Sequence, residues 1–303
     1  MVASRLNGIV TKTVICCSPD QFFQSQDLGY YVNCRKEVFA QIGQIRDMFS
    51  TPSNDSLNKI VILNPKGGCG KSTLVTNLAA VYAQRGTTPA IMDYDPQAST
   101  MGWLNRRPSD RPEIHGIAAY KNSMQATRSW QLRVPNNTVN LLIDSPASVT
   151  HDDLRELTRD STSILVPVLP SALDIRAASR CIADLLLVAK VDRRERKLAV
   201  VANRTRKNTR SFAKLMQFLD SLGIPIIAVL RDSQNFVRAA EEGVGVCEMQ
   251  PSRVKPDVEQ LDKIITWLDA WPDRRRLSKA ATAINRQPLT EQTILRRPQF
   301  GSA

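Results

Sequence analysis

Nine residues in the first third of the chain have the types and spacing needed to hold a phosphate group. Residues 65–73 read PKGGCGKST and contain three glycines within four positions. Without Cβ atoms, these glycines allow close approach, so that successive backbone N–H groups can point at phosphate oxygens. In such a loop Lys71 reaches the β- and γ-phosphates of a nucleotide, and the Ser72 hydroxyl ligates Mg²⁺. The segment therefore predicts a nucleotide-binding loop.

The segments on either side of this loop have the patterns of a strand and a helix. An apolar run at residues 60–63 precedes the glycines, and a helical pattern extends from Lys71 to about Gln84. The N-terminus of such a helix carries a partial positive charge, which favours an anion at the same place. Strand, loop and helix together predict one phosphate-binding unit.

Two later apolar runs also end in carboxylates. Residues 90–97 read AIMDYDPQ and include Asp93 and Asp95, and residues 139–147 read VNLLIDSPA and include Asp144. The second run, an apolar strand ending in Asp144, is typical of a Walker B element, in which the aspartate holds Mg²⁺ through a water. Because phosphoryl transfer depends mainly on positioning and charge, carboxylates beside Mg²⁺ and lysines are sufficient for hydrolysis.

The lysine at position 66, which an ordinary phosphate loop does not require, makes the loop more specific. The arrangement Lys-Gly-Gly-x-Gly-Lys-Ser resembles the deviant Walker A loop of the ParA/MinD ATPases, and is nearest to those of the ParA type. The resemblance implies that Lys66 reaches the phosphates of a partner subunit in a nucleotide-sandwich dimer. It also implies that Asp95 positions the attacking water, that Asp93 belongs to the Mg²⁺ shell and that Asn203 contacts adenine.

These considerations give one set of candidate residues for ATP and Mg²⁺. The expected catalytic residues are Lys66, Lys71 and Asp95. The residues expected to contact ATP are Lys66, Gly67, Gly68, Cys69, Gly70, Lys71, Ser72, Thr73 and Asn203. The expected metal ligands are Ser72, Asp93 and Asp144.

The rest of the pattern predicts an α/β fold. Further strands are expected at residues 164–169, 198–203 and 225–230, and helices at about 172–190, 208–222, 235–242 and 256–270. Alternating strands and helices form βαβ units, so we expect the mostly parallel, twisted sheet of a P-loop NTPase with helices on both faces. Phosphates bind at the carboxyl ends of such strands, which is where the three motifs fall.

The 303 residues suit one large domain with flanking segments. We expect an ATPase domain at residues 58–272, an N-terminal extension and linker of unknown role at 1–57, and a basic, disordered tail at 273–303. The extension could aid dimerisation or bind cargo, or Met48 could lie near the true start. The tail contains seven Lys or Arg against two acidic residues.

The composition favours a cytoplasmic protein with reduced thiols. No apolar run approaches the roughly 20 residues of a membrane span, and the start lacks a secretory signal pattern. The six cysteines do not have the spacing of metal ligands. Cys69 lies inside the phosphate loop, where a disulfide would prevent phosphate binding. Two histidines are too few for a histidine-based metal site.

The charge balance predicts a polyanionic partner. The chain carries 41 Lys and Arg against 29 Asp and Glu, a net charge of +12. Clustered basic residues neutralise backbone phosphates without reading bases, so we expect non-specific, salt-sensitive DNA binding on the nucleoid. Arg238 aligns with an arginine that the family uses for DNA contact. The candidates for DNA contact are Arg204, Arg206, Lys207, Arg231 and Arg238.

The resemblance as a whole implies a weak ATPase that dimerises on ATP, binds DNA, and is released when a ParB-like or cargo-adaptor protein stimulates hydrolysis. Its cargo could be a plasmid, a chromosome or a protein organelle such as the carboxysome. Residues 103–108 and 115–117 vary in the family and could serve partner recognition. Two alternatives remain open, a membrane-associated switch like MinD and a metabolic or metal-cluster-carrier member of the same branch. A membrane anchor is disfavoured because Pro298 interrupts the apolar pattern of the tail.

Overall fold

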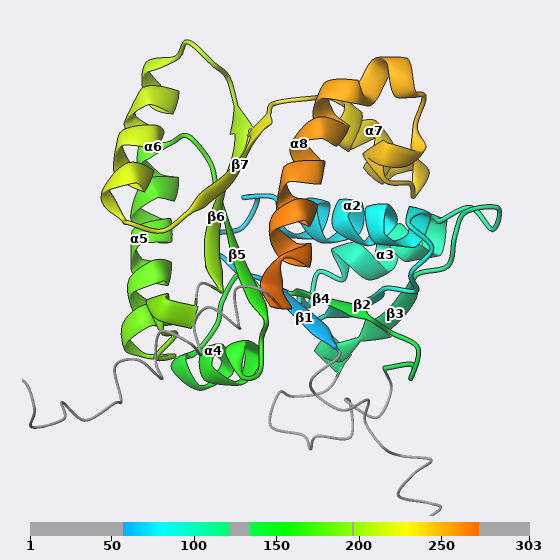
Figure 1. Ribbon diagram of the computed structural model, residues 1–303, viewed down its shortest axis with the longest axis horizontal. Coiled ribbons are helices and arrows are strands. Elements are labelled where there is room, and N and C mark those ends of the chain that lie inside the picture. Colours follow the sequence, from blue (N-terminus) through cyan, green and yellow to red (C-terminus); the bar gives the residue numbers. More distant parts are fainter. Residues whose placement is uncertain (1–56, 122–133, 196, 273–303) are drawn as a thin grey trace, which may run out of the picture. The chain divides into compact units, whose positions relative to one another are not determined.

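The computed structural model describes residues 57–121, 134–195 and 197–272, and its centre is a seven-stranded sheet (Figure 1). Every strand pair in it is parallel. The spatial order is β3-β2-β4-β1-β5-β6-β7. The strands are β1 (Asn58–Ile62), β2 (Ala90–Asp93), β3 (His115–Ala118), β4 (Asn140–Asp144), β5 (Ser163–Val168), β6 (Leu198–Thr205) and β7 (Ile226–Arg231).

Helices alternate with these strands along the chain, as βαβ units require. They are α2 (Lys71–Gln84), α3 (Ser99–Arg106), α4 (His151–Thr158), α5 (Ala172–Leu187), α6 (Arg210–Ser221), α7 (Asn235–Glu242) and α8 (Pro251–Asp269). Short 3₁₀ turns occur at η1 (Ala119–Lys121), η3 (Arg193–Glu195) and η4 (Val246–Glu248). The predicted fold class, a parallel sheet with helices on both faces, is confirmed.

The two faces of the sheet are covered by different helices (Figure 1). On one face, alternate strand residues such as Val61 and Ile143 pack with side chains of α4, α5 and α6. On the other face, the intervening residues such as Ile62 and Leu142 pack with α2, α3 and α8. Because successive strand side chains point to opposite faces, one short apolar strand such as β4 supplies both cores.

The central strand β1 is the point where the order of connections reverses, since β4 lies on one side of it and β5 on the other. Ligands bind at the carboxyl ends of strands at such a switch point. The registers pair Ile62 with Asp144 and Asp93 with Asp144. The phosphate loop that follows β1 and the two carboxylate motifs therefore lie at one edge of the sheet.

Several element boundaries differ from those expected. The short elements α3, α4 and β3 were not anticipated, and β6 continues to Thr205. Helix α8 begins at Pro251, five residues before the expected start. Pro251 occupies the first turn, where a missing N–H costs nothing, and Pro256 is accommodated inside the helix. The expected extension and tail lie outside the described residues except for Leu57, so the domain limits stay a prediction.

Candidate nucleotide site

The phosphate loop connects β1 to α2 and has the backbone conformation that its glycines allow. Gly68 and Gly70 have φ values of +76° and +95°, in the region that side chains rarely adopt. A Cβ on Gly68 would meet no atom within 4 Å, whereas one on Gly70 would lie 2.3 Å from Nδ2 of Asn203. The loop is thus open where a phosphate would approach, and closely packed where it touches β6.

Two lysines of the loop have partners within the chain. The Lys71 side chain is buried, and its Nζ donates to the carbonyl of Asn64 at 3.1 Å and of Lys66 at 3.5 Å. The Asn64 side chain accepts from the Lys66 N–H at 2.9 Å and donates to the carbonyl of Pro167 at 2.7 Å. Asn64 therefore holds the start of the loop against β5, a role that sequence patterns did not indicate.

The second lysine, Lys66, forms an ion pair within its own chain. Its Nζ lies 2.6 Å from Oδ2 of Asp174 in the first turn of α5. Asp174 also accepts a hydrogen bond from the Ser171 hydroxyl, and its other oxygen is buried without a hydrogen-bond partner. Lys66 is one-third exposed while Asp174 is buried. The lysine expected to act on a partner subunit is therefore held by a side chain of α5.

The carboxylates at the ends of β2 and β4 have contrasting surroundings. Asp93 accepts from the Thr100 hydroxyl at 2.6 Å and from the backbone N–H groups of Asp95 and Met101. Both oxygens of Asp144 are buried and have no hydrogen-bond partner. Burial raises the pKa of Asp93, although its hydrogen bonds oppose the shift. Burial raises the pKa of Asp144 to about 7, against the opposing effect of the Ser72 hydroxyl.

The surroundings of Asp144 fit a Mg²⁺ site shared with a nucleotide. A buried carboxylate with unused oxygens beside the Ser72 hydroxyl is a hard oxygen donor set that a cation would satisfy. Within the described ranges, no group of three or more His, Cys, Asp or Glu side chains could hold a metal alone. That is the arrangement in which Mg²⁺ takes one or two protein ligands and completes its shell with phosphates and waters. Asp93, whose oxygens already have donors, fits the first shell less well.

Two adjoining cavities lie at this edge of the sheet. The larger, of about 810 Å³, is lined by the loop glycines, Lys71, Ser72 and Asp95. The smaller, of about 680 Å³, is lined by Asn203 and by apolar side chains that include Leu74, Leu230 and Phe236. The larger has the groups that bind phosphates, and the smaller has the mixture of apolar and polar groups that suits a base.

Asn203 lies at the wall of the smaller cavity but uses its amide within the protein. Its Nδ2 donates to the carbonyl of Cys69 at 2.9 Å, and its Oδ1 accepts the backbone N–H of Arg204 at 2.9 Å. The side chain thus connects the end of β6 to the phosphate loop. Its expected contact with adenine remains a prediction.

The five candidates for DNA contact do not share one environment. Arg206 pairs with Asp232 at 2.7 Å, and Arg231 forms a double contact with the buried Asp257. This hydrogen-bonded pair raises the pKa of Arg231. Arg204, Lys207 and Arg238 are exposed, and Arg204 lines both cavities. Two candidates therefore have intramolecular partners and a third faces the nucleotide site.

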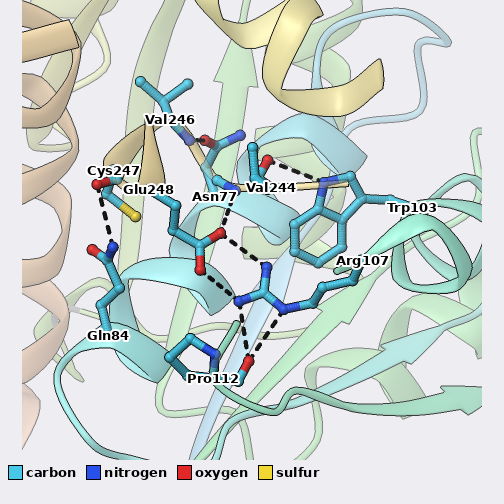
Figure 2. Close-up of polar contacts among 10 residues, drawn as sticks. Asn77, Gln84, Trp103, Arg107, Pro112, Val244, Val246, Cys247 and Glu248 are labelled. Carbon is cyan, nitrogen blue, oxygen red and sulfur yellow. Dashed lines mark hydrogen bonds and ion pairs between the residues drawn. The ribbon is translucent and has the colours of Figure 1, made fainter. Parts of the chain in front are cut away.

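A buried polar network fixes α3 beside the site (Figure 2). The guanidinium of Arg107 contacts both oxygens of Glu248 at 2.9 and 2.6 Å and lies 5.2 Å from the centre of the Trp103 ring. Glu248 also accepts the backbone N–H of Gly245 at 2.7 Å. The indole N–H of Trp103 donates to the carbonyl of Val244 at 3.2 Å. These hydrogen bonds and the ion pair, which join residues about 140 positions apart, therefore hold α3 against the segment before α8.

The same network corrects one expectation about partner recognition. Trp103 is buried, with 2% of its surface exposed, and residues 115–117 belong to strand β3. Buried packing thus accounts for Trp103, which is not available to a partner. Asp174, Asn64 and the Arg107–Glu248 pair are the site-supporting residues that sequence patterns missed, since nothing local in the sequence marks them.

Comparisons with known proteins agree with this geometry. The family model of the CobQ/CobB/MinD/ParA nucleotide binding domain matches residues 60–246, more than half of the chain. The maintenance of carboxysome distribution protein A of Halothiobacillus neapolitanus is 27% identical over 207 residues, covering 68% of this chain and 94% of that protein. Its counterpart from Gloeobacter kilaueensis is 25% identical over 232 residues, covering 72% of this chain and 97% of that protein.

A solved structure is similar in fold. The plasmid partition protein of Borrelia burgdorferi bound to AMPPNP superposes with a TM-score of 0.56 over 69% of this chain and 99% of that one, at 13% identity.

In the part of the chain that the structure describes, no helix is both long and apolar enough to cross a membrane.

Proposed function

Because this chain belongs to the CobQ/CobB/MinD/ParA nucleotide-binding family, it is a P-loop ATPase of the ParA/MinD class, and we propose that it is a DNA-bound positioning ATPase. In this proposal ATP brings two copies together and the dimer binds nucleoid DNA without sequence preference. An adaptor on the cargo stimulates ATP hydrolysis, and hydrolysis releases the protein from the DNA. The single observation that carries the proposal is that Lys71 of the phosphate loop, Asp95 after β2 and Asp144 at the end of β4 come from separate segments and meet at one edge of the sheet.

The first step is the binding of ATP along the phosphate loop. The backbone N–H groups of the loop and of the α2 N-terminus donate hydrogen bonds to the phosphates. The Lys71 ammonium exchanges the carbonyl of Asn64 for a phosphate oxygen. Ser72 and Asp144, with Asp93 behind them, are the residues that would hold Mg²⁺, which supplies positive charge against the β- and γ-phosphates. Asp95 lines the same cavity and is the proposed positioning group for the attacking water.

The second step couples nucleotide to dimerisation. Lys66 can pair either with Asp174 of its own chain or with the phosphates of a partner subunit. A switch needs an interaction that differs in strength between its two states, and the alternative partners of Lys66 provide one. The energy that the Asp174 pair contributes to the monomer must be exceeded by the phosphate contact in the dimer.

The third step is attachment to DNA. The net charge of +12 and the exposed Lys207 and Arg238 support contact with backbone phosphates. Arg206 and Arg231 contribute fewer free donors, because Asp232 and Asp257 already bind them. The names of the two relatives above support a carboxysome-type organelle as the cargo. A small adaptor carried by that cargo is the proposed activator.

Binding of the full-length protein to a random-sequence DNA duplex, with ATP and Mg²⁺ at two salt concentrations, tests the proposal. Wild type is compared with Lys66→Ala and Arg238→Glu, and Arg159→Glu is the matched control. Arg159 is about half exposed at the end of α4 and pairs with Glu156, so its reversal changes the net charge equally.

We expect wild type and Arg159→Glu to bind with ATP and to lose affinity as salt rises, while the other two variants bind weakly. Absence of ATP-dependent DNA binding by wild type at low salt would overturn the proposal. Binding to anionic lipid vesicles instead would then indicate a membrane-associated switch.

A further inference from the structure

The two cavities of the nucleotide site meet along a short wall that both of them share. Five residues line both cavities, and two of them are arginines: Gly70, Thr73, Arg106, Arg204 and Ala240. Lys71, Ser72 and Asp95 line only the larger cavity, and Leu230, Phe236 and Asn203 line only the smaller one. The shared wall is therefore the boundary between a phosphate-binding region and a base-type region.

A nucleotide that spans both cavities has a fixed direction. Its β- and γ-phosphates lie beside the loop glycines and Lys71, and its base lies beside Phe236. The part of the ligand that crosses the shared wall is then the ribose with the α-phosphate. This step rests on the proposed function, because it takes the ligand to be a nucleoside triphosphate or diphosphate.

The backbone at Arg204 is held in an uncommon conformation that aims it at this wall. Its φ is +48°, in the left-handed region that a non-glycine residue seldom adopts. Asn203 stabilises this turn, since its side chain accepts the Arg204 N–H and donates to the carbonyl of Cys69 in the phosphate loop. Backbone strain that surrounding contacts maintain is concentrated at binding and catalytic sites.

Arg204 and Arg106 differ from three neighbouring arginines in their lack of a carboxylate partner. Arg107, Arg206 and Arg231 form ion pairs with Glu248, Asp232 and Asp257. Among the described residues, neither Arg204 nor Arg106 has a carboxylate within ion-pair distance, and Arg106 makes one long contact, 3.4 Å, to the carbonyl of Ala240. Two guanidinium groups without a carboxylate partner on the wall of an anion-binding cavity suit a phosphate oxygen.

We propose that Arg204, assisted by Arg106, binds the α-phosphate and ribose of the nucleotide held by its own chain. Sequence patterns placed Arg204 among the DNA contacts, and its position on the cavity wall assigns it to the nucleotide instead. The contact involves the part of the ligand that ATP and ADP share. Arg204 therefore contributes equally to the affinity for both, unlike a residue that senses the γ-phosphate.

The test measures the affinities of the full-length protein for ATP and ADP by titration calorimetry, and its DNA affinity in parallel. Arg204→Ala is expected to weaken ATP and ADP binding by the same factor, about tenfold, the usual effect of losing one charge-assisted hydrogen bond. Arg106→Ala should have a smaller effect of the same kind. Arg159→Ala, at the end of α4 and outside both cavities, is the control and should leave both affinities unchanged.

Two further variants separate the side chain from the backbone. Glycine adopts a positive φ without strain, so Arg204→Gly should lose as much nucleotide affinity as Arg204→Ala. Arg204→Lys should recover part of that affinity. Unchanged nucleotide affinity in Arg204→Ala would overturn the proposal, with or without weaker DNA binding, and so would a loss confined to ATP. If wild type binds neither nucleotide, the proposed function fails with it, a result distinct from failure of the variant alone.

Discussion

Two buried carboxylates, Asp144 at the end of β4 and Glu248 in η4, have opposite surroundings. Glu248 receives two contacts from Arg107 and one from a backbone N–H, so its charge is fully paired. Asp144 is equally buried, yet neither of its oxygens has a hydrogen-bond partner. Buried polar groups without partners are rare and need an explanation, and a ligand is the natural one at the carboxyl edge of a parallel sheet.

The contrast between paired and unpaired buried carboxylates extends to the two regions in which they lie. The network between α3 and η4 satisfies its polar groups and holds the fold together, whereas the carboxyl edge of the sheet leaves oxygens of Asp144 and Asp174 unused. Functional sites commonly keep such unfavourable features, which the rest of the structure compensates. Mutation should therefore cost stability in the network, and cost activity more than stability at the sheet edge.

The largest expected effect on stability is that of Glu248→Ala. It leaves the Arg107 guanidinium, which is 7% exposed, without a counter-ion, and we expect a loss of about 3–5 kcal/mol in the free energy of unfolding. Urea unfolding followed by circular dichroism measures it. The double variant Arg107→Met/Glu248→Met removes both charges and should lose less than the single variant. A double variant less stable than Glu248→Ala would contradict this account.

Asp144→Asn should have the opposite effect on stability. The folded-state pKa of Asp144 is about 7 and the unfolded value is near 3.8, so the folded state binds more protons between these values. Stability due to this group is then present at low pH and falls as pH rises from about 4 to 7, by up to about 4 kcal/mol.

The variant lacks this titration, so it should be more stable than wild type at pH 8 and similar at pH 4. Urea unfolding at both pH values, without nucleotide or Mg²⁺, measures the difference, and ATP hydrolysis should be lost at both. A variant that is less stable than wild type at pH 8 would show that Asp144 is paired in the folded protein.

A smaller change is expected from Asp174→Asn, which weakens the hold on Lys66. The ion pair is partly exposed, so we expect the unfolding free energy to fall by only about 1 kcal/mol. Lys66 is then more available to a partner subunit, and dimers should form at a lower ATP concentration. Light scattering during an ATP titration measures this, and Lys66→Ala, which removes the lysine itself, should abolish ATP-dependent dimers. A requirement for more ATP in Asp174→Asn would argue that the aspartate supports the dimer.

The smallest effect is expected from Arg85→Ala, at the exposed C-cap of α2. Arg85 pairs with Asp262 and Asp269, but all three side chains are 44–48% exposed. Exposed pairs of this kind contribute about 0–1 kcal/mol, so this variant is the baseline for the other three in the same urea unfolding experiment. A loss comparable to that of Glu248→Ala would remove the distinction between buried and exposed pairs.

Much of the sheet edge could be predicted from sequence because its chemistry is local. The loop at residues 65–73 and the aspartates after β2 and β4 each lie in one short segment, next to the strand that positions them. Helix α2 has the expected limits because its pattern extends over several turns, and the shorter α7 has them as well.

The supporting contacts could not be predicted in this way, since they join distant segments. Lys66 meets Asp174 across 108 positions, and Arg107 meets Glu248 across 141. Strand β3 escaped notice because four residues give too little periodicity to identify, and helices α3 and α4, with eight residues each, were also not anticipated. The basic residues were misleading for a related reason, as charge alone does not reveal that Arg206 and Arg231 have acidic partners.

Calorimetric titration of the full-length protein with ATP and Mg²⁺ tests most directly whether the carboxyl edge of the sheet binds the nucleotide. The titration compares wild type with Lys71→Ala and Arg85→Ala. We expect wild type and Arg85→Ala to bind ATP with the same affinity. Lys71→Ala, verified as folded by circular dichroism, should bind ATP at least about tenfold more weakly. Equal affinity for ATP in wild type and folded Lys71→Ala would contradict the assignment of the sheet edge as the nucleotide site.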